Sequence, residues 1–218
     1  MRPPPTAWLP VLGLLLALGP GACCHLNRLA SLSAPLGEVS VEAANLGSAF
    51  LVLERRADRA EGVVMRGGGG LSNVFNRYHR AVEALGDGRL AEGLSVSLAV
   101  ALERSLGWAA AEGERSAMLR AEVEELRILA TDPAASVQVR WQVWAELRDA
   151  GGEVLWRDCL EVERPVQGLS LERLLVADDD ERARVQAALA REMADAIADR
   201  LRADARPGAS APGGEGKP

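Results

Sequence analysis

The most reactive residues of this chain are its three cysteines and two histidines, and three of these five stand together near the N-terminus. Cys23, Cys24 and His25 offer two thiols and an imidazole, but their spacing matches none of the usual zinc patterns. We therefore expect no metal and no cofactor. His79 lies beside arginines in a segment of helical spacing, and no nucleophile elbow accompanies it. We expect a solvated helix face there and no catalytic triad.

Two further segments have compositions that bind ions in other proteins. Gly67–Gly70 precede a helical pattern, where backbone N–H groups could hold an anion, with Arg66 beside them. The run lacks the Lys-Ser/Thr pair of a phosphate loop, which favours a flexible loop. Asp178–Asp180 lack the alternating spacing and the glycine of a calcium loop. They are expected to cap the helix that follows and to complement its dipole.

The composition is that of a globular protein, with 48% hydrophobic and 26% charged residues among 218. A net charge of −6 disfavours nucleic acid as a partner, because nucleic-acid-binding surfaces are basic. Three cysteines are too few for a disulfide scaffold in a chain of this length. Without its two ends, the chain has about 170 residues, which suits one domain.

The N-terminus has the features of a secretory signal over residues 1–22. Arg2 gives a positive start, residues 8–18 are an apolar run too short to span a bilayer comfortably, and Gly21-Ala22 are small. A cysteine directly after them resembles the bacterial lipoprotein signal, although Pro20 stands where an aliphatic residue is usual. This resemblance implies lipidation of Cys23. Ordinary secretion and an uncleaved anchor are the alternatives.

The rest of the chain divides into three parts. Residues 23–36 are polar and contain Ser, Ala and Pro, as in a tether. Residues 37–204 form the domain. Residues 205–218 are rich in Pro, Gly, Ser and Ala, and we expect them to be disordered because they cannot bury a core.

Alternating and helical periods predict the elements of the domain. Short strands are expected over 36–44 and 49–53. Helices are expected from Ser72 or Asn73 to Leu85 and over 89–106, with Gly107 as a stop. The alternation that starts at Met118 predicts a strand to about Leu129.

The clearest signal is a hairpin. Residues 137–147 and 154–162 alternate apolar and polar side chains on either side of a turn at 149–153. Trp141 lies on the apolar parity and is expected in the core. Trp144 lies on the polar parity and is either covered by a helix or exposed for a partner. Cys159 lies on the polar parity of the second strand, and Cys24 is its only possible intramolecular partner if Cys23 is lipidated.

A long amphipathic helix is predicted over 179–204. Leu189 and Ile197 lie on its apolar stripe and are expected to be buried. If the sheet covers that stripe, the opposite face remains for a partner. Arg191 and Asp195 lie on that face, and together with Trp144 they are our candidates for partner contact.

The region from Leu119 to Leu201 resembles the outer-membrane lipoproteins that assist lipopolysaccharide assembly. The resemblance rests on the two strands, on the turn Asp149-Ala150-Gly151-Gly152 and on the final helix, which ends Ile197-Ala198-Asp199-Arg200-Leu201. Auxiliary lipoproteins of lipid-transporting ABC systems share much of this pattern.

The predicted fold is therefore an α/β two-layer sandwich, with a mostly antiparallel sheet packed against two or three helices. The resemblance implies a non-enzymatic accessory lipoprotein on the periplasmic face of the outer membrane. Its expected partners are the membrane, through the lipid, and an envelope protein such as an outer-membrane barrel or an ABC transporter component. A secreted periplasmic hydrolase and a purely structural lipoprotein are the alternatives.

Overall fold

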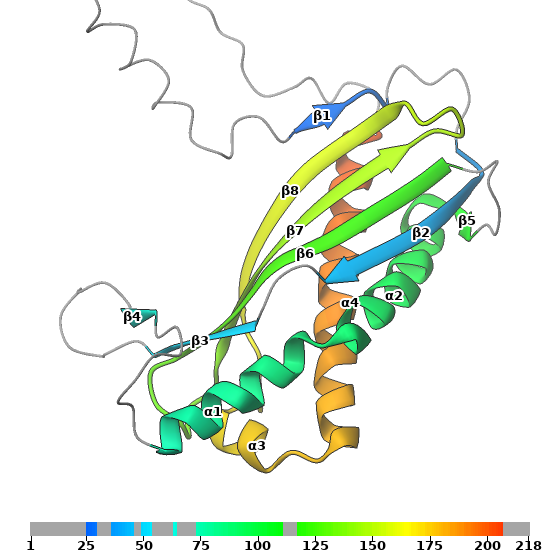
Figure 1. The fold of residues 1–218 in the computed structure, drawn as a ribbon. Helices are drawn as coiled ribbons and strands as arrows, with labels where there is room; N and C mark the ends of the chain where they lie inside the picture. Colours follow the sequence, from blue (N-terminus) through cyan, green and yellow to red (C-terminus); the bar gives the residue numbers. More distant parts are fainter. Residues whose placement is uncertain are drawn as a thin grey trace, which may run out of the picture.

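The computed structural model describes residues 25–29, 36–45, 49–53, 63–64, 73–110 and 117–206. One mixed sheet carries helices on one of its faces (Figure 1). The expected α/β class is confirmed. Cys23, Cys24, Gly67–Gly70 and residues 207–218 lie outside the described residues.

Three long antiparallel strands form the centre of the sheet: β6 (Ala117–Ala130), β7 (Gln138–Arg148) and β8 (Val154–Pro165). The apolar side chains at alternate positions of these strands are buried, as the alternation predicts, and Trp141 is only 1% exposed. The predicted hairpin turn is confirmed. Asp149 accepts hydrogen bonds from the N–H groups of Gly151 and Glu153, and Gly152 adopts a φ of 84°, which favours glycine.

The other edge of the sheet is parallel to β6, which makes the sheet mixed. β2 (Glu38–Asn45) pairs with the first half of β6, and β3 (Ala49–Leu53) pairs with the second half. The register of β6 against β7 shifts between Val123 and Glu125, close to where β2 gives way to β3. A helical crossover joins the parallel strands, as parallel pairing requires.

That crossover consists of α1 (Asn73–Glu83), a short 3₁₀ turn at Ala84–Gly86 and α2 (Gly88–Leu106). Asp87 caps α2 by accepting a hydrogen bond from the N–H of Arg89, and Gly107 ends it with a φ of 69°. Both helices lie where their periodicity predicts.

The last helix, α4 (Asp179–Asp204), begins and ends at the predicted residues, and Asp178 caps it. Leu189 and Ile197 are 1% and 0% exposed, which confirms the apolar stripe. α4 crosses α2 closely, because a Cβ added at Gly93 would lie 3.4 Å from the Cβ of Ala190. The two helices therefore form one layer that covers one face of the sheet (Figure 1).

Four short elements were not expected. These are β1 (Leu26–Asn27), β4 (Val63–Val64), β5 (Ala109–Ala110) and α3 (Leu171–Val176). β1 lies within the predicted tether and pairs antiparallel with β8. Residues 25–29 are therefore part of the folded body and not a free connection.

Candidate functional site

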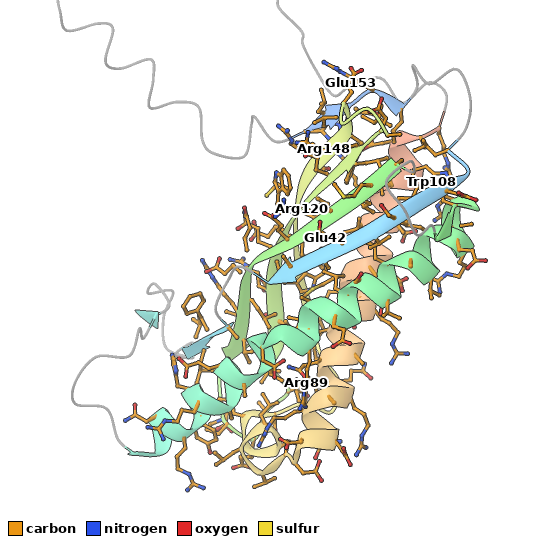
Figure 2. All side chains as sticks on the ribbon, turned by 45° about the vertical axis from the view of Figure 1, so that its right-hand side comes forward. Glu42, Arg89, Trp108, Arg120, Arg148 and Glu153 are labelled. Carbon is orange, nitrogen blue, oxygen red and sulfur yellow. The ribbon has the colours of Figure 1, made fainter. Side chains whose placement is uncertain are left out.

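The face of the sheet opposite α2 and α4 is not covered by either helix. Its side chains come from the alternate, polar positions of β6, β7 and β8. Figure 2 shows Arg120 and Arg148 on this side of the sheet. We call it the open face. Its members are Arg120, Glu122, Glu125 and Arg127 on β6, Arg140, Gln142, Trp144, Glu146 and Arg148 on β7, and Arg157, Cys159, Glu161 and Glu163 on β8.

Glu146 is the buried charge of the open face, at 3% exposed. Arg148 donates to its Oε1 at 2.6 Å, and Arg157 donates to its Oε2 at 2.7 Å. Two guanidinium groups thus compensate one desolvated carboxylate, which would be costly to bury alone. Glu146 thereby positions both arginines.

Trp144 lies next to this group and is half-buried. The guanidinium carbon of Arg157 is 5.7 Å from the centre of the Trp144 ring, a cation–π distance. Directly across the strands from Trp144 lie Glu122 and Cys159. Trp144 was expected to be either covered by a helix or exposed for a partner. Neither α2 nor α4 covers it, because both helices lie on the other side of the sheet.

The end of the open face away from Glu146 holds a polar hollow of about 130 Å³, lined by Glu125, Arg127, Arg140, Gln142 and Glu161. Arg127 donates to Glu125, and this hydrogen bond raises the pKa of the Arg127 guanidinium above its ordinary value. Gln142 donates to the Sγ of Cys159 at 3.3 Å. The charged groups of the hollow are therefore engaged with one another.

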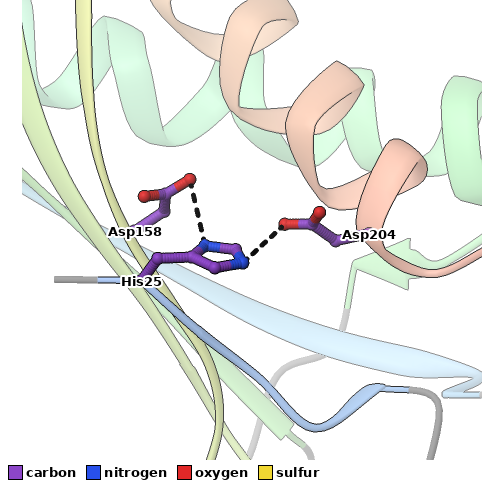
Figure 3. Close-up of side chains that lie close together, drawn as sticks. All are labelled: His25, Asp158 and Asp204. Atoms are coloured by element: carbon purple, nitrogen blue, oxygen red, sulfur yellow. Dashed lines mark ion pairs between the residues drawn. The ribbon is translucent and has the colours of Figure 1, made fainter. Parts of the chain in front are cut away.

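A second charged group lies where β1, β8 and the end of α4 meet (Figure 3). His25 Nδ1 is 3.4 Å from Asp158 Oδ2, and His25 Nε2 is 3.9 Å from Asp204 Oδ2. Arg200 donates to Asp158 at 2.7 Å and lies 3.5 Å from Asp204. We call these four residues the edge cluster.

The ligand atoms of His25, Asp158 and Asp204 lie within 4.8 Å of one another, which is close enough to hold a metal ion. Arg200 already supplies the positive charge at this place. The hydrogen bond to Asp158 raises the pKa of the Arg200 guanidinium, a group that stays protonated in proteins. Trp156 Nε1 also donates to Asp204 Oδ2 at 2.9 Å. The geometry is that of a structural ion cluster, and we assign it no metal.

The candidate contact residues do not come together. Trp144 is on the open face, whereas Arg191 and Asp195 are exposed on the side of α4 that faces away from the sheet. Asp195 pairs with Arg104 of α2, which ties the two helices together. His79 pairs with Glu83 along α1, an element that contributes no residue to either charged group.

The edge cluster was not predicted, although the sequence contains a signal for it. Asp158 shares the apolar parity of Trp156 and Leu160, and Asp204 follows Ile197 and Leu201 on the buried stripe of α4. A carboxylate on a buried face needs a partner. Two of them on elements that pack together predict a shared cation, and Arg200 is that cation.

Comparisons with known proteins add little. No protein-family model matches the chain, and no curated protein matches its sequence.

Solved structures show a remote likeness. A minor lipoprotein from Acinetobacter baumannii is 17% identical, with a TM-score of 0.37, over 52% of this chain and 85% of its own. A protein of the DUF330 family from Xanthomonas campestris is 18% identical, with a TM-score of 0.35, over 78% of this chain and 90% of its own. A hypothetical protein from Chlamydia trachomatis is 11% identical, with a TM-score of 0.40, over 78% of this chain and 98% of its own. Likeness this remote supports no conclusion about activity.

Proposed function

We propose that this chain is a non-enzymatic accessory lipoprotein of the bacterial envelope, anchored by lipid at Cys23, that binds a protein partner through the open face. The observation that carries the proposal is Trp144, a large aromatic side chain on the face of the sheet that the helices leave uncovered. Half-buried aromatic and arginine side chains are typical of the residues that dominate binding energy in interfaces.

Binding is favoured over catalysis by the state of the charged groups. The open face holds Glu146 between two arginines and Arg140 beside two glutamates. A face whose charges compensate one another presents a rigid, specific pattern. It does not provide the unpaired acid or base of an active site.

The anchor is the second part of the proposal. No helix among the described residues is long and apolar enough to cross a membrane. The apolar run at 8–18 and the Gly21-Ala22-Cys23 sequence favour export and lipidation. Stable attachment requires more than one acyl chain. We place the protein on the periplasmic face of the outer membrane, in lipid or lipopolysaccharide transport, with an outer-membrane barrel or an ABC transporter component as its partner.

The anchor is tested by Cys23→Ser. Wild-type protein should incorporate labelled palmitate and fractionate with membranes, and the variant should do neither. Cys24→Ser is the matched control and should behave as wild type. A wild type that takes up no palmitate, together with a variant that stays in the membrane fraction, would contradict lipidation.

The open face is tested by complementation. In a strain that lacks this protein, we expect sensitivity to detergent because lipid transport to the outer membrane is impaired. Wild type and Arg191→Ala should restore resistance, and Trp144→Ala should not, at equal protein levels. Restoration by Trp144→Ala combined with failure of Arg191→Ala would move the partner site to the outer side of α4. A normal envelope in the deletion strain would contradict the transport role.

A further inference from the structure

We infer that residues 25–29 fix the orientation of the body at the membrane, so that the edge of the molecule formed by β8 and the end of α4 faces the lipid surface. The inference rests on the proposed lipidation of Cys23 and adds to it a defined geometry.

The backbone of residues 26–28 is held on the outer edge of β8. Leu26 and Asn27 pair with Arg157 and Trp156. The N–H of Arg28 donates to the carbonyl of Leu155 at 2.8 Å. Leu29 is 7% exposed and belongs to the hydrophobic core. A tether that merely connects the lipid to the body would make none of these contacts.

Side chains attach the same segment to α4. Asn27 Nδ2 donates to the carbonyl of Asp204 at 2.9 Å. His25 lies between Asp158 of β8 and Asp204 of α4, so that it contacts both elements (Figure 3). The segment therefore joins the end of α4 to the edge of the sheet, and its first residue is held as well as its last.

The length of chain between this segment and the lipid is short. Cys23 precedes His25 by two residues, which span at most about 7 Å when fully extended. The Cα of Cys23 therefore lies within about 7 Å of the Cα of His25, and a lipid on Cys23 enters the bilayer close to the edge cluster. The body cannot turn freely, as it would on a long linker.

This geometry has a consequence for the open face. The sheet order β1-β8-β7-β6-β2-β5 places β8 beside the anchor and β2 at the opposite side. With the β8 edge at the membrane, the strands are stacked away from the lipid surface. The open face then stands upright on the membrane surface, so that a partner embedded in or attached to that membrane can reach Trp144 from the side.

The orientation is measured with fluorescent labels at two positions that lie at the same level along the strands, on the side of the sheet that carries the open face. Cys159 on β8 and Ala44 on β2 are both half-buried, and the pairing of Ala44 with Glu122, of Glu122 with Trp144 and of Trp144 with Cys159 sets them level. One full-length protein carries Cys24→Ser and retains Cys23 and Cys159, and the other carries Cys24→Ser, Cys159→Ser and Ala44→Cys and retains Cys23. The lipoprotein, with its acyl chains verified by mass spectrometry, is reconstituted into phosphatidylethanolamine–phosphatidylglycerol vesicles with an energy acceptor on the lipid headgroup.

We expect stronger energy transfer from the label at position 159 than from the label at position 44. Three strand spacings separate the two strands, so that the distance of the first label to the headgroups should be shorter by about 14 Å. A six-residue Gly/Ser insertion between Cys24 and His25 should abolish the difference, because it adds about 20 Å of reach. The same insertion between Gly213 and Gly214 is the control and should preserve it.

Equal transfer from the two positions in a lipidated protein would overturn the inference and leave the proposed lipoprotein intact. An N-terminal peptide without acyl chains would overturn both. Hydrogen exchange reads the docking separately: the amide of Arg28 should exchange slowly in wild type and in both insertion variants. Rapid exchange in wild type would also overturn the inference.

Discussion

The two faces of the central sheet use the same strands for opposite purposes. Trp141 and Trp144 are three residues apart on β7, yet one is 1% exposed under the helices and the other lies half-buried beneath Arg157. The covered face is held by apolar burial, which is strong and not directional. The open face is held by ion pairs and hydrogen bonds, which add specificity at modest net stability. Stability and recognition are therefore separable in this molecule by the choice of face.

Exchange of the two tryptophans for alanine should separate the faces most clearly. Trp141→Ala should lower the free energy of unfolding by about 3–5 kcal/mol, because it leaves a cavity in the core. Trp144→Ala should cost about 1 kcal/mol, the scale of a partly exposed cation–π contact. Urea denaturation of both variants measures this. Similar losses would mean that the two faces do not differ in this way.

The helical side of the covered face gives the next largest effect. Ile197→Ala should cost about 2–5 kcal/mol, since Ile197 is fully buried between α4 and the sheet. Thermal unfolding checks it against Ala203→Ser, an exposed change on the same helix. An Ile197→Ala protein that melts with wild type would remove Ile197 from the core.

The open face should show a smaller, charge-dependent effect at Glu146. Glu146→Ala should cost about 1–3 kcal/mol, because it removes the hydrogen bonds of two arginines to one buried carboxylate. Glu161→Ala removes an exposed partner of Arg140 and should cost less than about 0.5 kcal/mol. Urea denaturation at low and high salt compares them. A Glu161→Ala cost as large as that of Glu146→Ala would show that burial does not set the strength of these pairs.

The smallest effect is expected outside both faces. Deletion of residues 206–218 should leave the melting temperature unchanged, because a segment of Pro, Gly, Ser and Ala makes few contacts. Thermal unfolding of the truncated and full-length proteins measures this. A fall of several degrees on truncation would place the tail against the body.

The sequence by itself determined the elements whose side chains have a clear period. The hairpin of β7 and β8, the turn at Asp149 and both ends of α4 follow from alternation, turn chemistry and capping, which act between residues close in the chain. The burial of Trp141, Leu189 and Ile197 follows from the same periods, because a regular element has only one apolar side to bury.

Tertiary structure alone decided which distant segments meet. β2 is parallel to β6, although more than seventy residues separate their paired positions. β1 adds to the edge of β8, and His25 lies beside Asp158 and Asp204, although more than a hundred residues separate each of these N-terminal positions from its partner. No local period encodes these contacts, since a strand two residues long has no period and either strand direction buries the same side chains. Whether a helix covers Trp144 was likewise decided by tertiary structure. Its parity placed it on the polar face, but only the packing of α2 and α4 on the other side left that face open.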